Sequence, residues 1–161
     1  MTFRSAVPLL LLLGLPGCRR TDRRNTVVAA PTSSRNAAAM EAPVRLTAAQ
    51  KARWTGMKLG VIDLAAKKET PVDVPVGSEF ALPGSDLRVR ILALVPDFTL
   101  DNGVITSRTD QDRNPAAQVL LTENGRELFR GWLFARFPET HPFEHPRYAL
   151  RLLELEPEKA P

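Results

Sequence analysis

Residues 117–134 read AQVLLTENGRELFRGWLF, two apolar runs on either side of a central Asn124-Gly125 pair. Both residues of this pair accept a positive φ, and such a pair between two apolar runs is the strongest short-range signal of a β-hairpin with a type I′ turn. The segment therefore predicts two antiparallel strands, 117–122 and 128–134, joined by a tight turn.

Other segments on both sides of this hairpin also predict strands. In each of them apolar residues recur at alternate positions or in a short run, which is the pattern of a strand with a buried face. These segments are 57–61, 72–76, 87–91, 104–106 and 148–155. Pro71 and Pro75 cannot donate to a β-ladder, so the strand at 72–76 is expected at a sheet edge. A further turn is expected at Pro83-Gly84.

Seven short strands with turn signals between them predict an all-β domain at residues 47–156, either an antiparallel β-sandwich or a small barrel. The chain of 161 residues allows one such domain with an extension. Its 14 prolines and 6% aromatic residues favour strands and turns over a helical bundle. Residues 157–161 are expected to form a short tail.

One short helix is expected at residues 48–54, before the first strand. Thr47 and Gln50 have the spacing of a capping box, in which each side chain accepts a hydrogen bond from the other's backbone amide. A helix this short is not stable alone, so Trp54 is expected to dock it onto the domain. The segment 96–114 is long and polar at its tip, and we expect a loop that either carries recognition or is mobile.

The N-terminal 17 residues have the features of a secretory signal. A positive charge at Arg4 precedes an apolar stretch, 6–17, which is shorter than the roughly 20 residues that span a bilayer. The only cysteine follows in Leu15-Pro16-Gly17-Cys18, a sequence that resembles the lipobox of bacterial lipoproteins. The resemblance implies cleavage before Cys18 and attachment of lipid to this residue. The alternative is that Cys18 is a buried free cysteine. In both cases a chain with a single cysteine cannot form a disulfide framework.

Charge is distributed unevenly along the chain. Residues 1–53 hold 9 basic and 2 acidic side chains (+7), and residues 54–161 hold 13 and 16 (−3). The net charge of +4 therefore belongs to the N-terminal part and does not indicate a nucleic-acid partner.

Residues 18–46 lack a sustained apolar period and are expected to be a flexible basic linker, spanning roughly 30 Å as a coil. Its arginines either attract an anionic membrane surface or remain solvated. The residue after the cysteine is Arg19 and not an aspartate. In this the chain resembles lipoproteins that are sorted to the outer membrane. We therefore expect a periplasm-facing, lipid-anchored protein of the cell envelope, at the outer membrane rather than the inner one.

The two histidines occur together in HPFEHP, residues 141–146. His141, Glu144 and His145 are candidate metal ligands, because imidazole and carboxylate groups are common ligands of zinc and copper. The two prolines of this segment disfavour the helix that would place both rings on one face. The alternative is a structural role, in which His145 and Phe143 pack the proline loop against the strand at 128–134.

The sequences Gly131-Trp132-Leu133-Phe134 and Phe143-Glu144-His145-Pro146 resemble a family of bacterial envelope domains of unknown function. Members share Gly-Trp-x-Phe, a proline loop and Glu-His-Pro before the last strand, and the likeness covers about residues 57–155. The resemblance implies a β domain without a known activity. The expected structural motif comprises Gly131, Trp132, Phe134, Phe143, Glu144, His145 and Pro146. We expect Trp132, Phe134, Phe143 and His145 to form a single corner.

No motif for catalysis or cofactor binding is found. The chain has no Gly-x-Ser-x-Gly elbow and no glycine-rich phosphate loop. We therefore expect a non-catalytic, membrane-anchored binding module without a cofactor, whose partner is another envelope protein.

Two alternatives remain open. A weaker likeness, from Asp97-Phe98 to Gly131, is to the extracytoplasmic domain of membrane proteins of cytochrome c maturation. It implies an accessory factor in the assembly of cytochrome c or a respiratory complex. The other alternative is a metal-binding protein that uses the two histidines.

Overall fold

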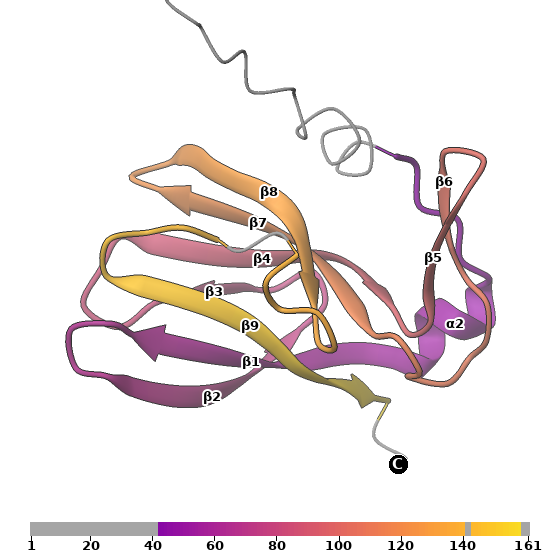
Figure 1. Cartoon of the computed structure of the whole chain (residues 1–161), viewed down its shortest axis with the longest axis horizontal. Helices are drawn as coiled ribbons and strands as arrows, with labels where there is room; N and C mark the ends of the chain where they lie inside the picture. Colours follow the sequence, from indigo (N-terminus) through magenta and orange to yellow (C-terminus); the bar gives the residue numbers. More distant parts are fainter. Residues whose placement is uncertain (1–41, 141–142, 159–161) are drawn as a thin grey trace, which may run out of the picture. The chain divides into compact units, whose positions relative to one another are not determined.

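The computed structural model describes residues 42–140 and 143–158. The expected signal peptide, Cys18, most of the expected linker and His141 lie outside these ranges. Within them one short helix precedes nine strands, and the prediction of an all-β sandwich is confirmed (Figure 1). The elements are α2 (Ala48–Arg53), β1 (Trp54–Asp63), β2 (Lys68–Pro75), β3 (Glu79–Ala81), β4 (Leu87–Val95), β5 (Phe98–Asp101), β6 (Val104–Ser107), β7 (Ala116–Glu123), β8 (Arg126–Phe134) and β9 (Tyr148–Pro157).

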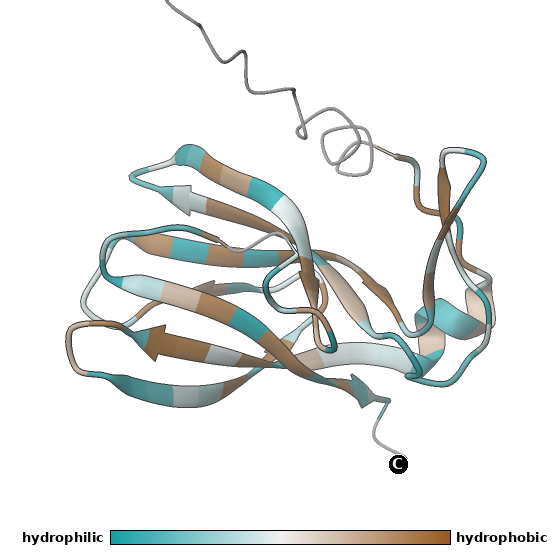
Figure 2. Ribbon diagram, in the orientation of Figure 1, coloured by the Kyte–Doolittle hydropathy of each residue, from teal (hydrophilic) through white to brown (hydrophobic). Residues whose placement is uncertain are grey.

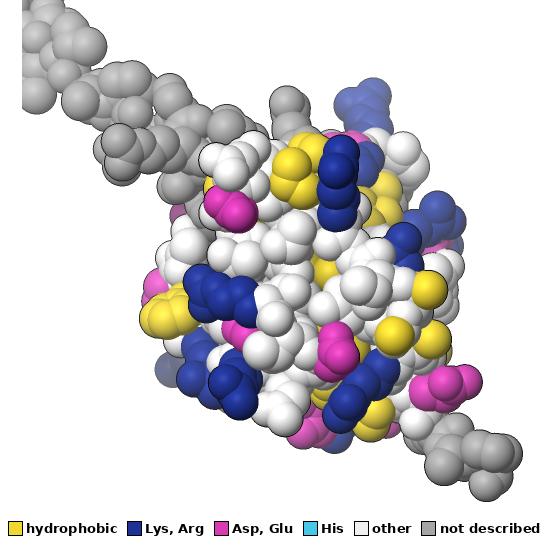
Figure 3. Space-filling model, turned by 90° about the vertical axis from the view of Figure 1, so that its right-hand side faces the viewer, with side chains coloured by type: hydrophobic (Ala, Val, Ile, Leu, Met, Phe, Trp, Pro, Cys, Tyr) yellow, Lys and Arg dark blue, Asp and Glu magenta, His cyan; other side chains and the backbone are white. Residues whose placement is uncertain are grey.

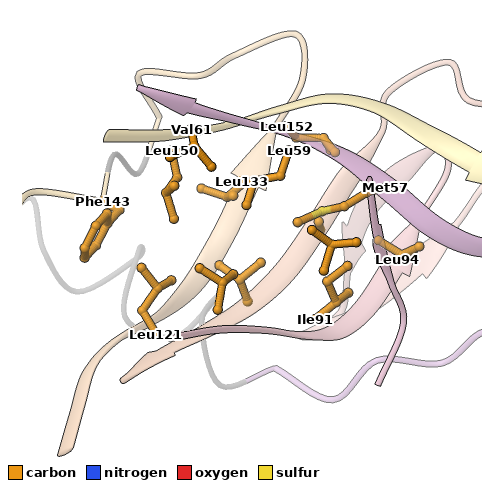
Figure 4. Close-up of a cluster of buried hydrophobic side chains, with 14 of the residues drawn as sticks. Met57, Leu59, Val61, Ile91, Leu94, Leu121, Leu133, Phe143, Leu150 and Leu152 are labelled. Atoms are coloured by element: carbon orange, nitrogen blue, oxygen red, sulfur yellow. The ribbon is translucent and has the colours of Figure 1, made fainter. Parts of the chain in front are cut away.

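Two antiparallel sheets form the sandwich. Their strand orders are β2-β1-β9 and β3-β4-β7-β8, and a separate β5-β6 ribbon lies at one end. Among the described strands no ladder joins the two main sheets, so the fold is a sandwich and not a closed barrel. The main core lies between the sheets, with Phe143 at one end and Met57 and Leu94 at the other (Figure 4).

The β7–β8 hairpin is the one that the sequence predicts. Glu123 pairs with Arg126 across a turn in which Asn124 and Gly125 have φ values of 49° and 77°. Both angles lie in the left-handed region, which a type I′ turn requires at its two central positions. The prediction of β2 as an edge strand is also confirmed.

The sheet that contains β4, β7 and β8 is covered on both faces near the β5-β6 ribbon. Hydrophobic and hydrophilic residues alternate along the first part of β4, but this alternation ends where both faces are buried (Figure 2). In three adjacent residue pairs the first member faces the main core and the second faces a smaller apolar cluster under the ribbon: Leu94 and Val95, Ala117 and Ala116, Leu133 and Trp132.

The segment 96–114 is more ordered than the expected polar loop. It forms the β5-β6 ribbon, whose turn at Asn102-Gly103 has φ values of 48° and 76°. The Phe98 ring makes edge contacts with the rings of Trp132 and Phe134, at centroid distances of 5.1 and 5.0 Å. Burial of these aromatic rings explains why the ribbon packs against the sheet rather than extending into solvent.

The domain also begins earlier than expected. Residues 42–46, assigned above to the linker, run beside β6. The backbone amide of Arg45 donates to the Ile105 carbonyl, and the backbone amide of Ile105 donates to the Pro43 carbonyl. Val44 and Leu46 pack against the smaller cluster and explain this order. The capping box of Thr47 and Gln50 is present as predicted.

The helix and the last strand also differ slightly from their predicted bounds. Trp54 is buried, but it begins β1 instead of ending the helix. At the other end of the domain, β9 extends to Pro157, and the Glu158 amide donates to the Arg53 carbonyl. The first residues of the expected tail are therefore part of the fold.

Candidate functional site

His145 caps the turn that leads into β9. Its Nδ1 atom accepts hydrogen bonds from the backbone amides of Arg147 and Tyr148, each at 3.2 Å. Its Nε2 atom lies 3.7 Å from Oε1 of Glu123. An imidazole nitrogen that accepts two amide protons cannot also donate its lone pair to a metal, so only Nε2 remains for that purpose.

The expected corner is divided between two clusters. The Phe143 ring contacts the Phe129 ring of β8 at 5.7 Å and stacks on His145 at 5.8 Å, so the proline loop does pack on the penultimate strand. Trp132 and Phe134 instead face the β5-β6 ribbon. The reason is the alternation of a strand, because Leu133 faces the main core and its two neighbours must face the opposite side.

The other motif residues have different surroundings. Gly131 is buried in β8 opposite Val119, whereas Glu144 and Pro146 are exposed. His141 lies outside the described residues. Within residues 42–140 and 143–158, no three or more His, Cys, Asp or Glu side chains are grouped as metal ligands.

The polar groups near His145 are used within the fold, and sequence reasoning did not find them. The Arg147 guanidinium donates to the Gly84 carbonyl at 3.0 Å and lies 3.4 Å from the Asp63 carboxylate. The Tyr148 hydroxyl donates to the Pro83 carbonyl at 2.6 Å. We call this end of the sandwich, with the turns after β1, β3 and β7, the histidine end. The polar contacts of its described residues connect the turns to one another.

The opposite end, which we call the ribbon end, comprises the β5-β6 ribbon, residues 42–47, α2 and the loop 108–114. Figure 3 faces it and shows Lys and Arg side chains at several points, interspersed with acidic and hydrophobic ones. Two pockets open here, and neither is marked by a continuous sequence motif.

The first, which we call the segment pocket, has a volume of about 510 Å³. It lies where residues 42–46 and α2 approach β4, and β4 has an irregular register between Ile91 and Ala93 at this place. Such a bulge bends a strand and redirects its side chains. The lining is mainly apolar and comprises Ala42, Val44, Leu46, Trp54, Val76, Leu92, Ala93 and Leu94, with Lys51 and Gln118 as polar groups.

The second, which we call the arginine pocket, has a volume of about 440 Å³. Arg108 and Arg113 come from the loop after β6, and Arg136 and Phe137 come from the loop after β8. The remaining lining residues are Asp97, Thr109 and Asn114.

Hydrogen bonds hold the loop 108–114 in place beside this pocket. Oδ2 of the buried Asp97 accepts from the Thr109 hydroxyl at 3.1 Å. The Trp54 indole donates to the backbone carbonyl of Asp110 at 3.2 Å. The side-chain amide of Asn114 donates to the backbone carbonyl of Phe98 at 3.1 Å. These contacts fix the backbone that carries Arg108 and Arg113.

The edge of β2 does not favour pairing with another strand. The Val76 amide donates to the Thr55 carbonyl, so the alternation of an antiparallel ladder directs the backbone nitrogens of Pro71 and Pro75 away from β1. Proline has no amide proton at these outward positions, which protects a sheet edge from strand addition.

The chain matches no protein-family model, no curated protein and no solved structure. Both resemblances given by the sequence motifs therefore remain predictions. Among the described residues, α2 has only six residues, and no helix is long and apolar enough to cross a membrane.

Proposed function

We propose that this chain is a lipid-anchored protein of the bacterial envelope and that its β-sandwich is a non-catalytic binding module for another envelope protein. The observation that carries the proposal is the segment pocket. A concave, mainly apolar site with a few polar groups is the usual form of a binding site, and Lys51 and Gln118 supply the polar groups here.

The position of the pocket supports this function. Residues 42–46, the last residues of the expected linker, form one of its walls. A partner located near the membrane would therefore meet the pocket close to the point where the tether joins the domain. Because tethering raises the effective concentration of the two proteins, a modest pocket is sufficient for binding.

The hydroxyl contacts support a role other than catalysis. The three serines within the described ranges each donate to a backbone carbonyl: Ser78 to Pro75, Ser85 to Leu82 and Ser107 to Thr109. The described histidine faces Glu123 and two backbone amides, and is not hydrogen-bonded to any serine. A serine nucleophile needs a base within hydrogen-bond reach.

Site-specific photocrosslinking in bacterial cells tests the proposal. A photoreactive residue replaces Val76 at the segment pocket or, as the control, Leu128 on β8, and these two side chains have similar exposures of 42% and 47%. We expect a discrete protein adduct from position 76 and none from position 128. Capture of a respiratory or haem-handling protein would favour the assembly factor. Absence of adducts, with turnover of a substrate or retention of stoichiometric metal, would contradict the binding module.

A further inference from the structure

We propose that the arginine pocket binds the phosphate group of an anionic membrane lipid and so holds the ribbon end against the bilayer. This inference rests on the proposed function only in placing the domain at a membrane. It is carried by different residues from those of the segment pocket, so each of the two proposals can fail without the other.

The first observation is that three guanidinium groups at this pocket have no carboxylate partner. Arg88, Arg90, Arg130, Arg147 and Arg151 each form an ion pair elsewhere in the domain. Within the described ranges, Arg108, Arg113 and Arg136 form none. Arg45, Arg53 and Arg126 form none either, but none of these three lines the arginine pocket. Arg108 donates only to the Thr99 hydroxyl and Arg113 only to the Gln111 side chain, both neutral groups.

The net charge of the lining favours an anion. Asp97 is the single acidic residue among the lining residues, so three arginines leave a net charge of +2. Asp97 is 5% exposed, and its carboxylate accepts from the Thr109 hydroxyl and forms no ion pair with a described arginine. The lining therefore carries an excess of positive charge, which an anion in the pocket would balance.

The donor chemistry favours phosphate. A guanidinium group presents two parallel N–H donors that match two oxygens of a phosphate, and such paired, charge-assisted hydrogen bonds are stronger than those between neutral groups. The three guanidinium groups come from two separate loops, 108–114 and the loop after β8, that line one pocket. The pocket volume of about 440 Å³ accommodates such a group with part of its head group.

The surroundings favour a lipid as the source of the phosphate. Phe137 lines the same pocket and is 59% exposed, the highest value among the large hydrophobic side chains that are exposed in the described ranges. An aromatic ring beside basic residues is typical of surfaces that lie at the boundary between head groups and acyl chains. Residues 42–46, the last residues of the expected lipid-anchored linker, join the same end beside β6.

Sedimentation with lipid vesicles tests the inference. The chain begins at residue 18 and carries Cys18→Ala, so that neither an acyl group nor the apolar stretch 6–17 contributes. The vesicles are phosphatidylcholine with or without phosphatidylglycerol. The pocket variant is Arg108→Gln, Arg113→Gln and Arg136→Gln, and the control loses three charges elsewhere through Arg88→Gln, Arg90→Gln and Arg126→Gln. We expect each pocket substitution to weaken partitioning into the anionic vesicles by about fivefold and the control variant to change it much less.

A charge-conserving variant separates phosphate recognition from general attraction. Replacement of the three pocket arginines by lysine keeps the charge but removes the paired donors, so we expect weaker vesicle binding than in the parent chain. Inorganic phosphate added as a competitor should displace the parent chain from vesicles and have less effect on the lysine variant.

Three results would overturn the inference. One is equal partitioning of the pocket and control variants, and another is full vesicle binding by the lysine variant. The third result has two parts: the pocket binds inorganic phosphate, but vesicle binding does not depend on the three arginines. This result would mean that the ligand of the pocket is a free phosphate and not a lipid. Thermal unfolding of each variant verifies that the domain is folded. The crosslinking result at position 76 is independent of all three.

Discussion

His145 has two structural functions in one side chain. Its ring stacks between those of Phe143 and Tyr148, and its Nδ1 atom accepts from two backbone amides. The acceptor role requires an unprotonated Nδ1, which leaves the proton of the neutral ring on Nε2, toward Glu123. The sequence indicated both a metal site and a structural role for this residue, and these contacts favour the second.

Substitution of His145 separates its two functions. His145→Phe keeps a stacked ring but removes the acceptor, and we expect the free energy of unfolding to fall by about 1–2 kcal/mol. His145→Asn keeps an acceptor close to the position of Nδ1, and we expect a smaller loss. Urea unfolding measures both. A phenylalanine variant as stable as the parent chain would contradict the capping role.

Asp63 gives a pH dependence with a definite sign. The backbone amide of Ala66, followed by the charge of Arg147, holds the pKa of Asp63 below its usual range. The folded pKa is therefore lower than the unfolded one, so the stabilisation is present above about pH 4 and is lost as the pH falls through the folded pKa. Asp63→Asn keeps the turn but removes the charge. Its stability deficit should be largest near neutral pH and disappear in acid, and a deficit that grows in acid would contradict this assignment.

The β5-β6 ribbon stabilises the domain by covering the outer face of β8. Phe98→Ala removes the ring that contacts Trp132 and Phe134, and we expect the free energy of unfolding to fall by about 2–4 kcal/mol. Exchange of the Trp132 indole proton with solvent should become faster. Leu100→Ala is the control, because Leu100 lies on the same strand but is 45% exposed, and it should cost less than about 1 kcal/mol. Equal effects of the two changes would show that the ribbon does not act as a cover.

Residues 42–46 also act as a structural element. A chain that begins at residue 42 keeps the hydrogen bonds to Ile105 and the packing of Val44 and Leu46, and a chain that begins at residue 47 loses them. We expect the shorter chain to be less stable by about 1–3 kcal/mol, from the loss of buried apolar surface. Thermal unfolding of the two chains measures this difference. Equal stability would show that residues 42–46 are part of the linker and do not stabilise the domain.

Strands with one buried face could be predicted from the alternation of apolar and polar residues. Strands that lack this alternation could not. Alternation in 57–61 and 87–91 and the Asn124-Gly125 turn identified β1, β4 and the β7–β8 hairpin. β3 was missed because three residues are too few to show a period, and β5 was missed because its residues fall in the segment that was expected to be a loop. The separation of Trp132 from Phe143 depends on the ribbon covering a second face, which is a tertiary effect.

Neither pocket at the ribbon end was visible in the sequence. The arginine pocket combines residues from position 97 to position 137, and the segment pocket combines residues from position 42 to position 118. Their separation along the chain leaves no motif to detect. By contrast, the histidine motif is compact in sequence, and its described aromatic residues, Phe143 and His145, pack against their neighbours.

At the scale of the whole molecule, the two ends of the sandwich differ in their available chemistry. At the histidine end, Arg147, Tyr148 and His145 bind to neighbouring turns and to the backbone. At the ribbon end, an apolar pocket and an arginine pocket lie beside the segment to which the expected tether leads. Pockets beside Tyr148 lie at the histidine end as well, so the proposed membrane-facing role rests on the arginines of the ribbon end and on its junction with the expected tether.

The central claim is that this module is tethered through Cys18, a residue outside the described ranges. Cells expressing the full chain or Cys18→Ala, grown with a labelled fatty acid, are separated into membrane and soluble fractions. The account predicts that the parent chain carries the label and sediments with the membrane, whereas the variant carries no label. Equal membrane retention of the two chains, with no label in either, would contradict the tether.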